Sequence, residues 1–204
     1  MSALDVVEVL TGRRRADRRR WAQASSLADL CQVTTGWLRD EVHWCPGYYG
    51  RVDVDEAEGL LEALVAANRA GFLTVNSQEG FDGPGFDRAR WQQCAWVCGF
   101  APADLAVRLV GAAERAGYTA VVWTPATAPV TVTWRAGQPY TGDAWEDPET
   151  ITECLFLGVG PAALGEVLAA AQVTIIDPQI GRNELWAWLE RTMTGLTAQV
   201  GGGS

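Results

Sequence analysis

One stretch of the chain, residues 68–78, constrains the fold most strongly, because it joins the end of a helix directly to a strand. Gly71 suits the left-handed residue that ends many helices. The apolar and partly β-branched run at residues 72–75 predicts a short buried strand. Three hydrogen-bonding residues follow at 76–78 and lead into a glycine-rich loop. Because α/β proteins usually bind ligands at such strand exits, this pattern predicts a ligand site here.

The rest of the chain alternates between helical and strand-like segments. Ser26 with Asp29 is typical of a helix start, and Asp53 or Asp55 is expected to cap the helix that ends at Gly71. The mixture predicts an α/β or α+β fold, with mixed β-sheets flanked by helices. Further helices are expected at residues 2–11, 102–116, 161–171 and 183–194, strands at 92–100, 119–123, 130–134, 154–159 and 173–176, and loops at 80–87 and 136–149.

A chain of 204 residues, 48% of them hydrophobic, is long enough for a single globular domain with a substantial core. We expect an N-terminal helix and Arg-rich arm at residues 1–25 and an α/β ligand-binding domain at residues 26–196. Residues 197–204 are expected to form a tail that ends in a Gly-Gly-Gly-Ser linker.

Charge separates the N-terminal arm from the rest of the chain. The segment Arg13–Arg20 holds six arginines and one aspartate, so the remaining residues carry a net charge of −14 within a total of −9. An acidic body repels nucleic acid and anionic membranes, and it is compatible with a cationic small ligand. The Arg cluster has no aromatic residues between its charges, which is more typical of a solvated arm than of a nucleic-acid interface.

The sequence indicates a cytoplasmic protein. No uninterrupted apolar run is long enough to span a bilayer, and Asp5 and Glu8 interrupt the apolar N-terminal residues, which argues against a signal peptide. The five cysteines lack the spacing of a disulfide framework, which favours free thiols in a reducing compartment.

Two pairs of residues are candidates for a metal site. Cys94 with Cys98, and His43 with Cys45, could together supply four ligands for zinc, but nothing in the spacing brings the pairs together. Cys94, Trp96 and Cys98 would share one apolar face of a strand, so we expect them to pack in the core and expect no metal or cofactor.

Several motifs resemble one known family, the C-terminal regulatory domain of eukaryotic methylenetetrahydrofolate reductase, which binds S-adenosylmethionine and S-adenosylhomocysteine. The resemblance covers roughly residues 26–193, and it implies an α/β fold that binds an adenosine-containing molecule. The chain is also similar to proteins of high-GC (actinobacterial) bacteria and their phages, in keeping with its use of arginine and no lysine. The motifs are an acidic helix start at Glu56, Asn68-Arg69-Ala70-Gly71, Leu73-Thr74-Val75-Asn76-Ser77-Gln78, the segment Gln93–Phe100, Thr174-Ile175-Ile176-Asp177-Pro178 and the Trp-rich segment Leu185–Arg191.

The resemblance also implies which residues bind the ligand. In that family the residues that match Thr74 and Ser77 line the nucleoside site, and Thr174 matches a third lining hydroxyl. Glu56 would accept hydrogen bonds from a ribose diol or a ligand amine. Ala57 stands where the family has a threonine, so one side-chain contact is missing. Losing a neutral hydrogen bond typically costs about 0.5–1.5 kcal/mol, which weakens binding without preventing it.

Gln78 and Trp96 complete the predicted site, with Trp96 as apolar wall. The residues next to Thr133 match those around a further threonine of the family. Thr133 lies too far upstream in the chain, however, so its assignment is doubtful. From residue type alone, Thr74 and Ser77 could instead bond to local backbone where a strand ends. They are three residues apart, so a regular strand would point them to opposite faces, and a turn of the backbone at Ser77 is needed to bring them together.

Three functions remain open from the sequence. The first is non-catalytic binding, for sensing or sequestering, of S-adenosylmethionine, S-adenosylhomocysteine or a related compound, and a homodimer is compatible with it. The second is an enzyme that cleaves an adenosyl compound or signalling nucleotide in the same pocket, with a carboxylate or His43 facing the ligand; Asp82, Asp87 and Asp177 are candidate bases. The third is a protein-interaction module, such as a phage or host-defence factor, whose ligand site has decayed. No nucleophile elbow or phosphate-binding loop is present in the sequence.

Overall fold

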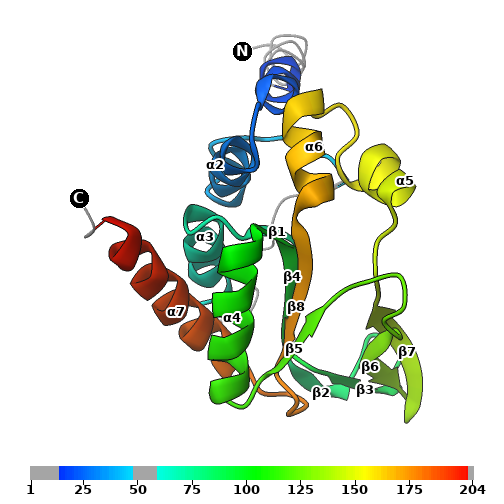
Figure 1. Ribbon diagram of the computed structural model, residues 1–204. Coiled ribbons are helices and arrows are strands. Elements are labelled where there is room, and N and C mark those ends of the chain that lie inside the picture. The colour runs from blue at the N-terminus through cyan, green and yellow to red at the C-terminus, as the bar shows by residue number, and fades with distance from the viewer. Residues whose placement is uncertain (1–13, 48–58, 202–204) are drawn as a thin grey trace, which may run out of the picture.

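A four-stranded antiparallel sheet, here called sheet A, organises the fold (Figure 1). Our computed structural model describes residues 14–47 and 59–201. The strand order of sheet A is β1-β4-β8-β5, so two strands that lie far apart in the sequence, β4 and β8, form its centre. Its strands are β1 (Leu73–Gln78), β4 (Trp96–Ala101), β5 (Thr119–Val122) and β8 (Ala171–Ile176).

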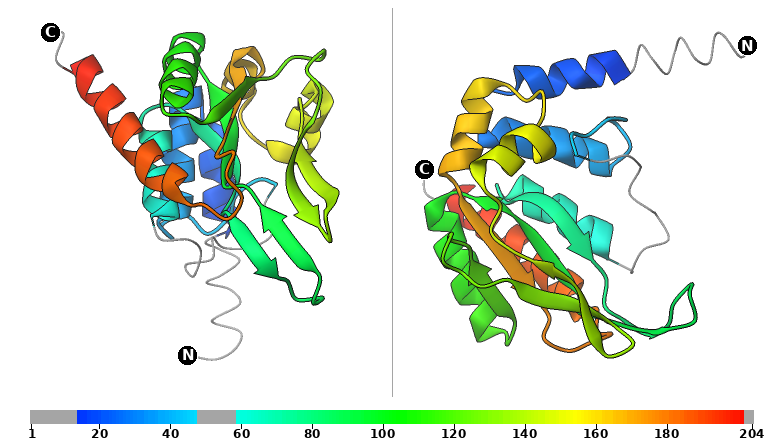
Figure 2. Two further views of the ribbon diagram at one scale, coloured as in Figure 1. Left: turned by 90° about the horizontal axis from the view of Figure 1, so that it is seen from below. Right: turned by 90° about the vertical axis from the view of Figure 1, so that its right-hand side faces the viewer.

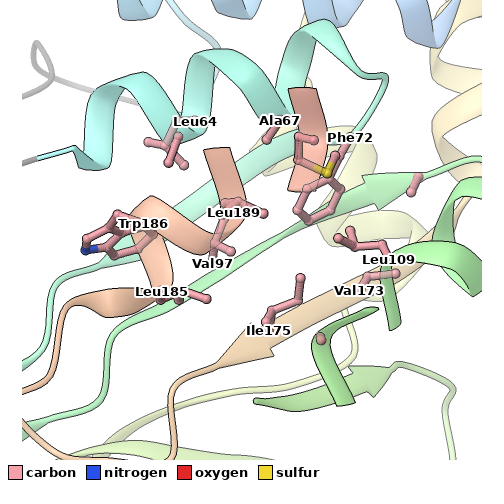
Figure 3. Close-up of a cluster of buried hydrophobic side chains, with 14 of the residues drawn as sticks. Leu64, Ala67, Phe72, Val97, Leu109, Val173, Ile175, Leu185, Trp186 and Leu189 are labelled. Atoms are coloured by element: carbon pink, nitrogen blue, oxygen red, sulfur yellow. The ribbon is translucent and has the colours of Figure 1, made fainter. Parts of the chain in front are cut away.

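Three helices cover one face of sheet A: α3 (Leu60–Arg69), α4 (Ala103–Arg115) and α7 (Glu184–Gly201) (Figure 1). Their apolar faces meet alternate residues of the central strands, because successive side chains of a strand point to opposite faces. Figure 3 shows side chains of α3, α7 and the central strands meeting in this core, where α7 packs against α3. Its members include Leu64, Phe72, Val97, Leu109, Val173, Ile175, Leu185, Trp186 and Leu189.

The opposite face of sheet A packs against the N-terminal helices and the segment that follows β7. The elements there are a helix at residues 14–23, α2 (Leu27–Leu38), the short α5 (Pro148–Thr150), the π-helix η1 (Ile151–Leu155) and α6 (Pro161–Ala169). A second buried cluster joins them to the sheet, and it includes Trp21, Leu30, Leu73, Phe100 and Phe156.

A second antiparallel sheet, sheet B, has the order β2-β3-β6-β7. Its strands are β2 (Phe81–Pro84), β3 (Arg90–Gln93), β6 (Val130–Arg135) and β7 (Gln138–Asp143). Figure 2 shows that it lies at the end of the molecule away from α2 and α6. A small third cluster, with Cys94, Trp96, Val132 and Ile176 buried and Cys98 packed against them, joins the two sheets.

The α+β class is confirmed, and the strands pair antiparallel within both sheets instead of mixing directions. Ser26 caps α2 as expected, since its hydroxyl accepts a 3.1 Å hydrogen bond from the amide of Asp29. Gly59 holds the N-cap position of α3. Asp53, Asp55 and the helix predicted at residues 2–11 lie outside the described residues.

Three segments differ from their predictions. The strand predicted at residues 92–100 breaks at Cys94-Ala95, where the chain passes from sheet B to sheet A. The loops predicted at 80–87 and 136–149 contain β2 and β7, and the latter follows a tight turn with positive φ at Ala136 and Gly137. The strand predicted at 154–159 was wrong. Asp147 and Pro148 instead start a helical turn that continues into η1, because the Asp147 carboxylate accepts bonds from the amides of Glu149 and Thr150.

The Arg-rich segment is a docked helix where residues 14–23 are described, and not a free arm. Trp21 is buried in the second cluster and donates a 2.9 Å hydrogen bond to the carbonyl of Trp44. Asp17 is also buried and accepts a 2.8 Å bond from the amide of His43. The arginines described on this helix are exposed, and the guanidinium of Arg18 lies 5.1 Å from the ring centroid of Trp44.

Burial divides the five free cysteines, and this predicts their reactivity. Cys154 is exposed, whereas burial raises the pKa of both Cys31 and Cys45 to about 12. Because the thiolate is the nucleophile, we expect one thiol to react rapidly with an aromatic disulfide reagent at about pH 8, and the buried thiols to react only on unfolding. The substitution Cys154→Ser should remove the fast phase. A fast phase that persists in this variant would contradict the assignment.

Candidate functional site

A cavity of about 120 Å³ lies along the outer edge of β1, between α2, α3 and η1, and we call it the β1 cavity. Its walls are mostly apolar and include three aromatic rings, while a few hydroxyl and amide groups enter from β1 and α2. This combination is typical of a small-molecule site. The lining residues are Trp21, Thr34, Trp37, Leu38, Cys45, Pro46, Leu64, Leu73, Thr74, Val75, Asn76, Ser77, Leu155 and Phe156.

A β-bulge at Val75 brings Thr74 and Ser77 to the same face of sheet A. Thr74 pairs with Gly99 and Asn76 pairs with Cys98, so Val75 is an extra residue in β1. A bulge of this kind shifts the alternation of side chains by one position. Ser77 then pairs with Val97, on the same face as Thr74. The turn expected at Ser77 is therefore absent, because β1 continues to Gln78, and the bulge achieves the same result.

The end of α3 holds Thr74 in place. Asn68, which is buried, donates a 2.7 Å hydrogen bond to the Thr74 hydroxyl and a 2.9 Å bond to the carbonyl of Leu64. The Thr74 hydroxyl accepts this bond and keeps its own hydrogen to donate. Within the described residues, no hydrogen bond reaches the hydroxyl of Ser77. Both hydroxyls can thus bond to a ligand in the β1 cavity.

A second cavity, of about 80 Å³, lies on the face of sheet A that is turned away from α3, α4 and α7, and we call it the acidic cavity. It adjoins the β1 cavity, because Val75, Asn76 and Leu155 line both. Thr174 lines it from the middle of β8 and not from a strand exit. The other lining residues are Cys98, Gly99, Phe100, Trp123, Asp143, Ala144, Glu146, Gln172 and Val173.

Thr174 is fully buried and its hydroxyl is engaged on two sides. It accepts a 2.7 Å hydrogen bond from the indole of Trp123 and donates a short bond to the carboxylate of Asp143. Burial raises the pKa of Asp143 above its usual value, although the bond from Thr174 opposes the shift. Burial, followed by the negative charge of Asp143, raises the pKa of Cys98 well above its usual value. The Asp143 carboxyl is thus held in place by neutral donors.

Glu146 supplies a second carboxyl to the acidic cavity. Its backbone is clamped by Gln172, whose side chain accepts a 2.9 Å bond from the Glu146 amide and donates a 2.7 Å bond to its carbonyl. Burial, followed by the charges of Asp143 and Asp147, raises the pKa of Glu146. Within the described residues, no hydrogen bond or ion pair reaches its carboxylate. Residues 143–146 were placed in a polar loop, and only the pairing of β7 with β6 shows that they return to sheet A.

Three of the residues assigned to the site lie elsewhere. Gln78 accepts a 3.0 Å bond from the hydroxyl of Thr133 and donates a 3.2 Å bond to the carbonyl of Cys94. Trp96 is buried in the cluster that joins the two sheets, and its indole N–H is the one buried side-chain polar atom in the described chain without a partner. Neither cavity includes Gln78, Trp96 or Thr133, so these residues join the sheets instead. Glu56 and Ala57 lie outside the described residues.

The three aspartates considered as bases are each bound by an arginine. Arg90 bonds Asp82 at 2.8 Å and lowers its pKa, and Arg182 bonds the fully buried Asp177 at 2.6 Å. Asp87 accepts bonds from the Trp91 indole and from Arg135, and its pKa falls to about 2, with the Trp91 bond as the largest cause. These carboxylates stabilise local structure, and they line neither of the two cavities.

His43 lies 3.3 Å from Asp40, outside both cavities. Cys94, Trp96 and Cys98 pack together as expected. Among residues 14–47 and 59–201, no three His, Cys, Asp or Glu side chains gather in a way that could hold a metal ion. In the same part of the chain, no helix combines the length and the apolar character needed to cross a membrane.

Exposed apolar side chains are spread over several elements. Phe86 is 93% exposed and Tyr140 is 57% exposed, and both rings contact Trp91, at centroid distances of 5.8 Å and 4.8 Å. The others belong to separate parts of the surface, on α4, β5, α6 and the loops after η1 and β8, and they are Val107, Val122, Leu157, Leu168 and Ile180.

Comparison with known proteins gives a family match that spans most of the chain. A family model described as "Domain of unknown function (DUF6919)" matches residues 16–196, which include both cavities. No curated protein matches the chain.

Proposed function

The chain belongs to the DUF6919 family, and we propose that it binds an adenosine-containing small molecule, such as S-adenosylmethionine or S-adenosylhomocysteine, without consuming it. The two adjoining cavities at β1 are the proposed site. The protein would sense or sequester this ligand in the cytoplasm, a compartment in which its five free thiols are stable.

One observation carries the proposal: hydroxyls from two distant regions line cavities that share a wall. Thr74 and Ser77 lie in the β1 cavity, and Thr174, about half of the chain away, lies in the acidic cavity. Val75 and Leu155 are common to both walls. Preorganised polar groups around apolar space are what a nucleoside site requires.

The chemistry of the two cavities suits the two ends of an adenosyl compound. The rings of Trp37 and Phe156 offer aromatic surface to a purine in the β1 cavity, near the hydroxyls of Thr74 and Ser77. Cavities for drug-sized ligands typically measure about 300–1,000 Å³, more than these two provide together. The ligand would therefore displace the side chain of Leu155, which stands between them.

We expect isothermal titration to detect binding of at least one adenosyl compound. Ser77→Ala should weaken that binding by about 0.5–1.5 kcal/mol, the usual worth of one hydrogen bond, without affecting stability, because no described residue bonds to this hydroxyl. Thr119→Ala is the control, since Thr119 is exposed on β5, lines neither cavity and has no described partner for its hydroxyl. The absence of heat and of any thermal shift at millimolar ligand would reject the proposal.

An enzyme that cleaves the same ligand is the second candidate, and the acidic cavity favours it. Carboxyls with raised pKa values, such as those of Asp143 and Glu146, can act as general acids when they face a substrate. Incubating the protein with the ligand and separating the mixture by chromatography distinguishes the two candidates. A binding protein returns the ligand unchanged, whereas an enzyme produces free adenine or another cleavage product.

A further inference from the structure

Resting on the proposed function, we infer that the acidic cavity selects a positive charge beside the nucleoside, so that the bound compound is an adenosyl sulfonium in preference to its neutral thioether. The carboxylates that would interact with this charge are those of Asp143 and Glu146. Neither residue belongs to the motifs that suggested a ligand site in the sequence.

Two carboxyls line the acidic cavity, and no positively charged side chain of the described residues lines it with them. Asp143 is 9% exposed and Glu146 is half-buried, and both line the cavity. No arginine of residues 14–47 and 59–201 lines it, and the chain contains no lysine. Among the described residues, the charged neighbours that raise the pKa of Glu146 are the carboxylates of Asp143 and Asp147.

The two carboxyls differ in their hydrogen bonds, because Asp143 has several donors and Glu146 has none among the described residues. Asp143 accepts bonds from neutral donors, among them the hydroxyl of Thr174, and no described residue bonds to the carboxylate of Glu146. A carboxylate removed from water is costly unless a cation or several donors compensate it. A cation in the cavity would supply that compensation, and the adjacent Trp123 ring would add cation–π attraction.

Position within the site explains why the charge should be a sulfonium. A purine held by Trp37 and Phe156 leaves the ribose near Asn76 and Leu155, where the β1 cavity meets the acidic cavity. The group attached to the ribose then enters the acidic cavity. S-adenosylmethionine places a sulfonium there and S-adenosylhomocysteine a neutral sulfur, while the rest of the two molecules is the same apart from one methyl group.

Titration calorimetry with both compounds tests the inference. We expect S-adenosylmethionine to bind about tenfold tighter, which corresponds to about 1.4 kcal/mol. In Glu146→Gln the ratio of the two affinities should fall towards one, while the affinity for S-adenosylhomocysteine stays the same. Asp143→Asn should act in the same direction, and Asn can still accept the bond from Thr174. Glu114→Gln, on the exposed face of α4 and outside both cavities, is the matched control.

The outcomes separate the charge selection from the proposed function. Equal affinities in the unsubstituted protein, or a ratio that Glu146→Gln leaves unchanged, overturn the charge selection and leave the proposed function standing. Failure of both compounds to bind overturns the proposed function, and the charge selection with it. Glu146→Gln removes no hydrogen bond between described residues, so it should fold normally, and its thermal unfolding midpoint checks this.

Discussion

Replacing Trp186 with alanine is expected to destabilise the protein by about 3–5 kcal/mol, the usual cost of deleting a buried aromatic side chain. Trp186 is fully buried between α3, α7 and sheet A, beside Leu64 and Leu185 (Figure 3). Its indole also donates a 3.2 Å hydrogen bond to Asn183. Asn183 in turn binds both backbone groups of Gly80, so the tryptophan supports the connection from β1 to sheet B as well as the core.

Urea unfolding measures this effect, read from the midpoint with the slope unchanged. Trp188→Ala is a matched control two residues later on α7. Trp188 is only partly buried and rests on the ring of Tyr118 at a centroid distance of 4.7 Å, so its removal should cost clearly less. Equal losses in the two variants would show that α7 does not depend on the packing described for Trp186.

Substituting Gly99 with alanine is expected to have the second large effect, because it would separate β1 from β4. A Cβ at this position would lie 2.1 Å from the carbonyl oxygen of Leu73 and 2.9 Å from the Cα of Thr74. Both neighbours are backbone atoms that cannot turn aside, so β1 would have to move. Overpacking of this kind costs about 1–3 kcal/mol and occasionally more. The shift would also remove Thr74 from the β1 cavity, so ligand binding should be lost along with stability.

Gly165→Ala provides the control for Gly99→Ala. Gly165 lies in α6, and nothing within 4 Å would meet an added Cβ. Alanine in a helix is favoured over glycine by about 0.5–1 kcal/mol, so this variant should be slightly more stable. Unfolding curves and ligand titrations on both variants make the comparison. If Gly99→Ala retains normal stability and binding, the close approach of β1 and β4 at the bulge is not present in solution.

The local parts of the fold were predictable because their causes lie within a few residues. The N-cap at Ser26, the glycine after α4 and the short β-branched run of β8 each depend on neighbouring side chains, and each prediction was confirmed. The strand predicted at 154–159 was wrong because the cause of the helix there lies outside that segment. Its apolar residues suggest a strand, but Asp147, several residues earlier, starts the helical turn that continues into η1.

The candidate site shows where local reasoning ends. Thr74 and Ser77 were identified, but their shared face depends on the bulge at Val75, which is visible only in the pairing of β1 with β4. Trp96 was also assigned to the site, but the break between β3 and β4 places it between the two sheets. Gln78 bonds to Thr133 of β6 and to the carbonyl of Cys94 instead of lining a cavity. A strand that changes sheets leaves no clear signal in composition or periodicity.

By itself, the sequence determined most of the helices, the central strands of sheet A and the start of α2, since propensity, capping and apolar periodicity act over a few residues. Only the tertiary structure decided that Thr174 meets Trp123 and Asp143, and that their cavity adjoins the one beside Thr74. The reason is physical. Contacts between β5, β7 and β8 join residues far apart in the chain, and their geometry follows from sheet register and from the packing of the sheet faces, which no short stretch of sequence encodes.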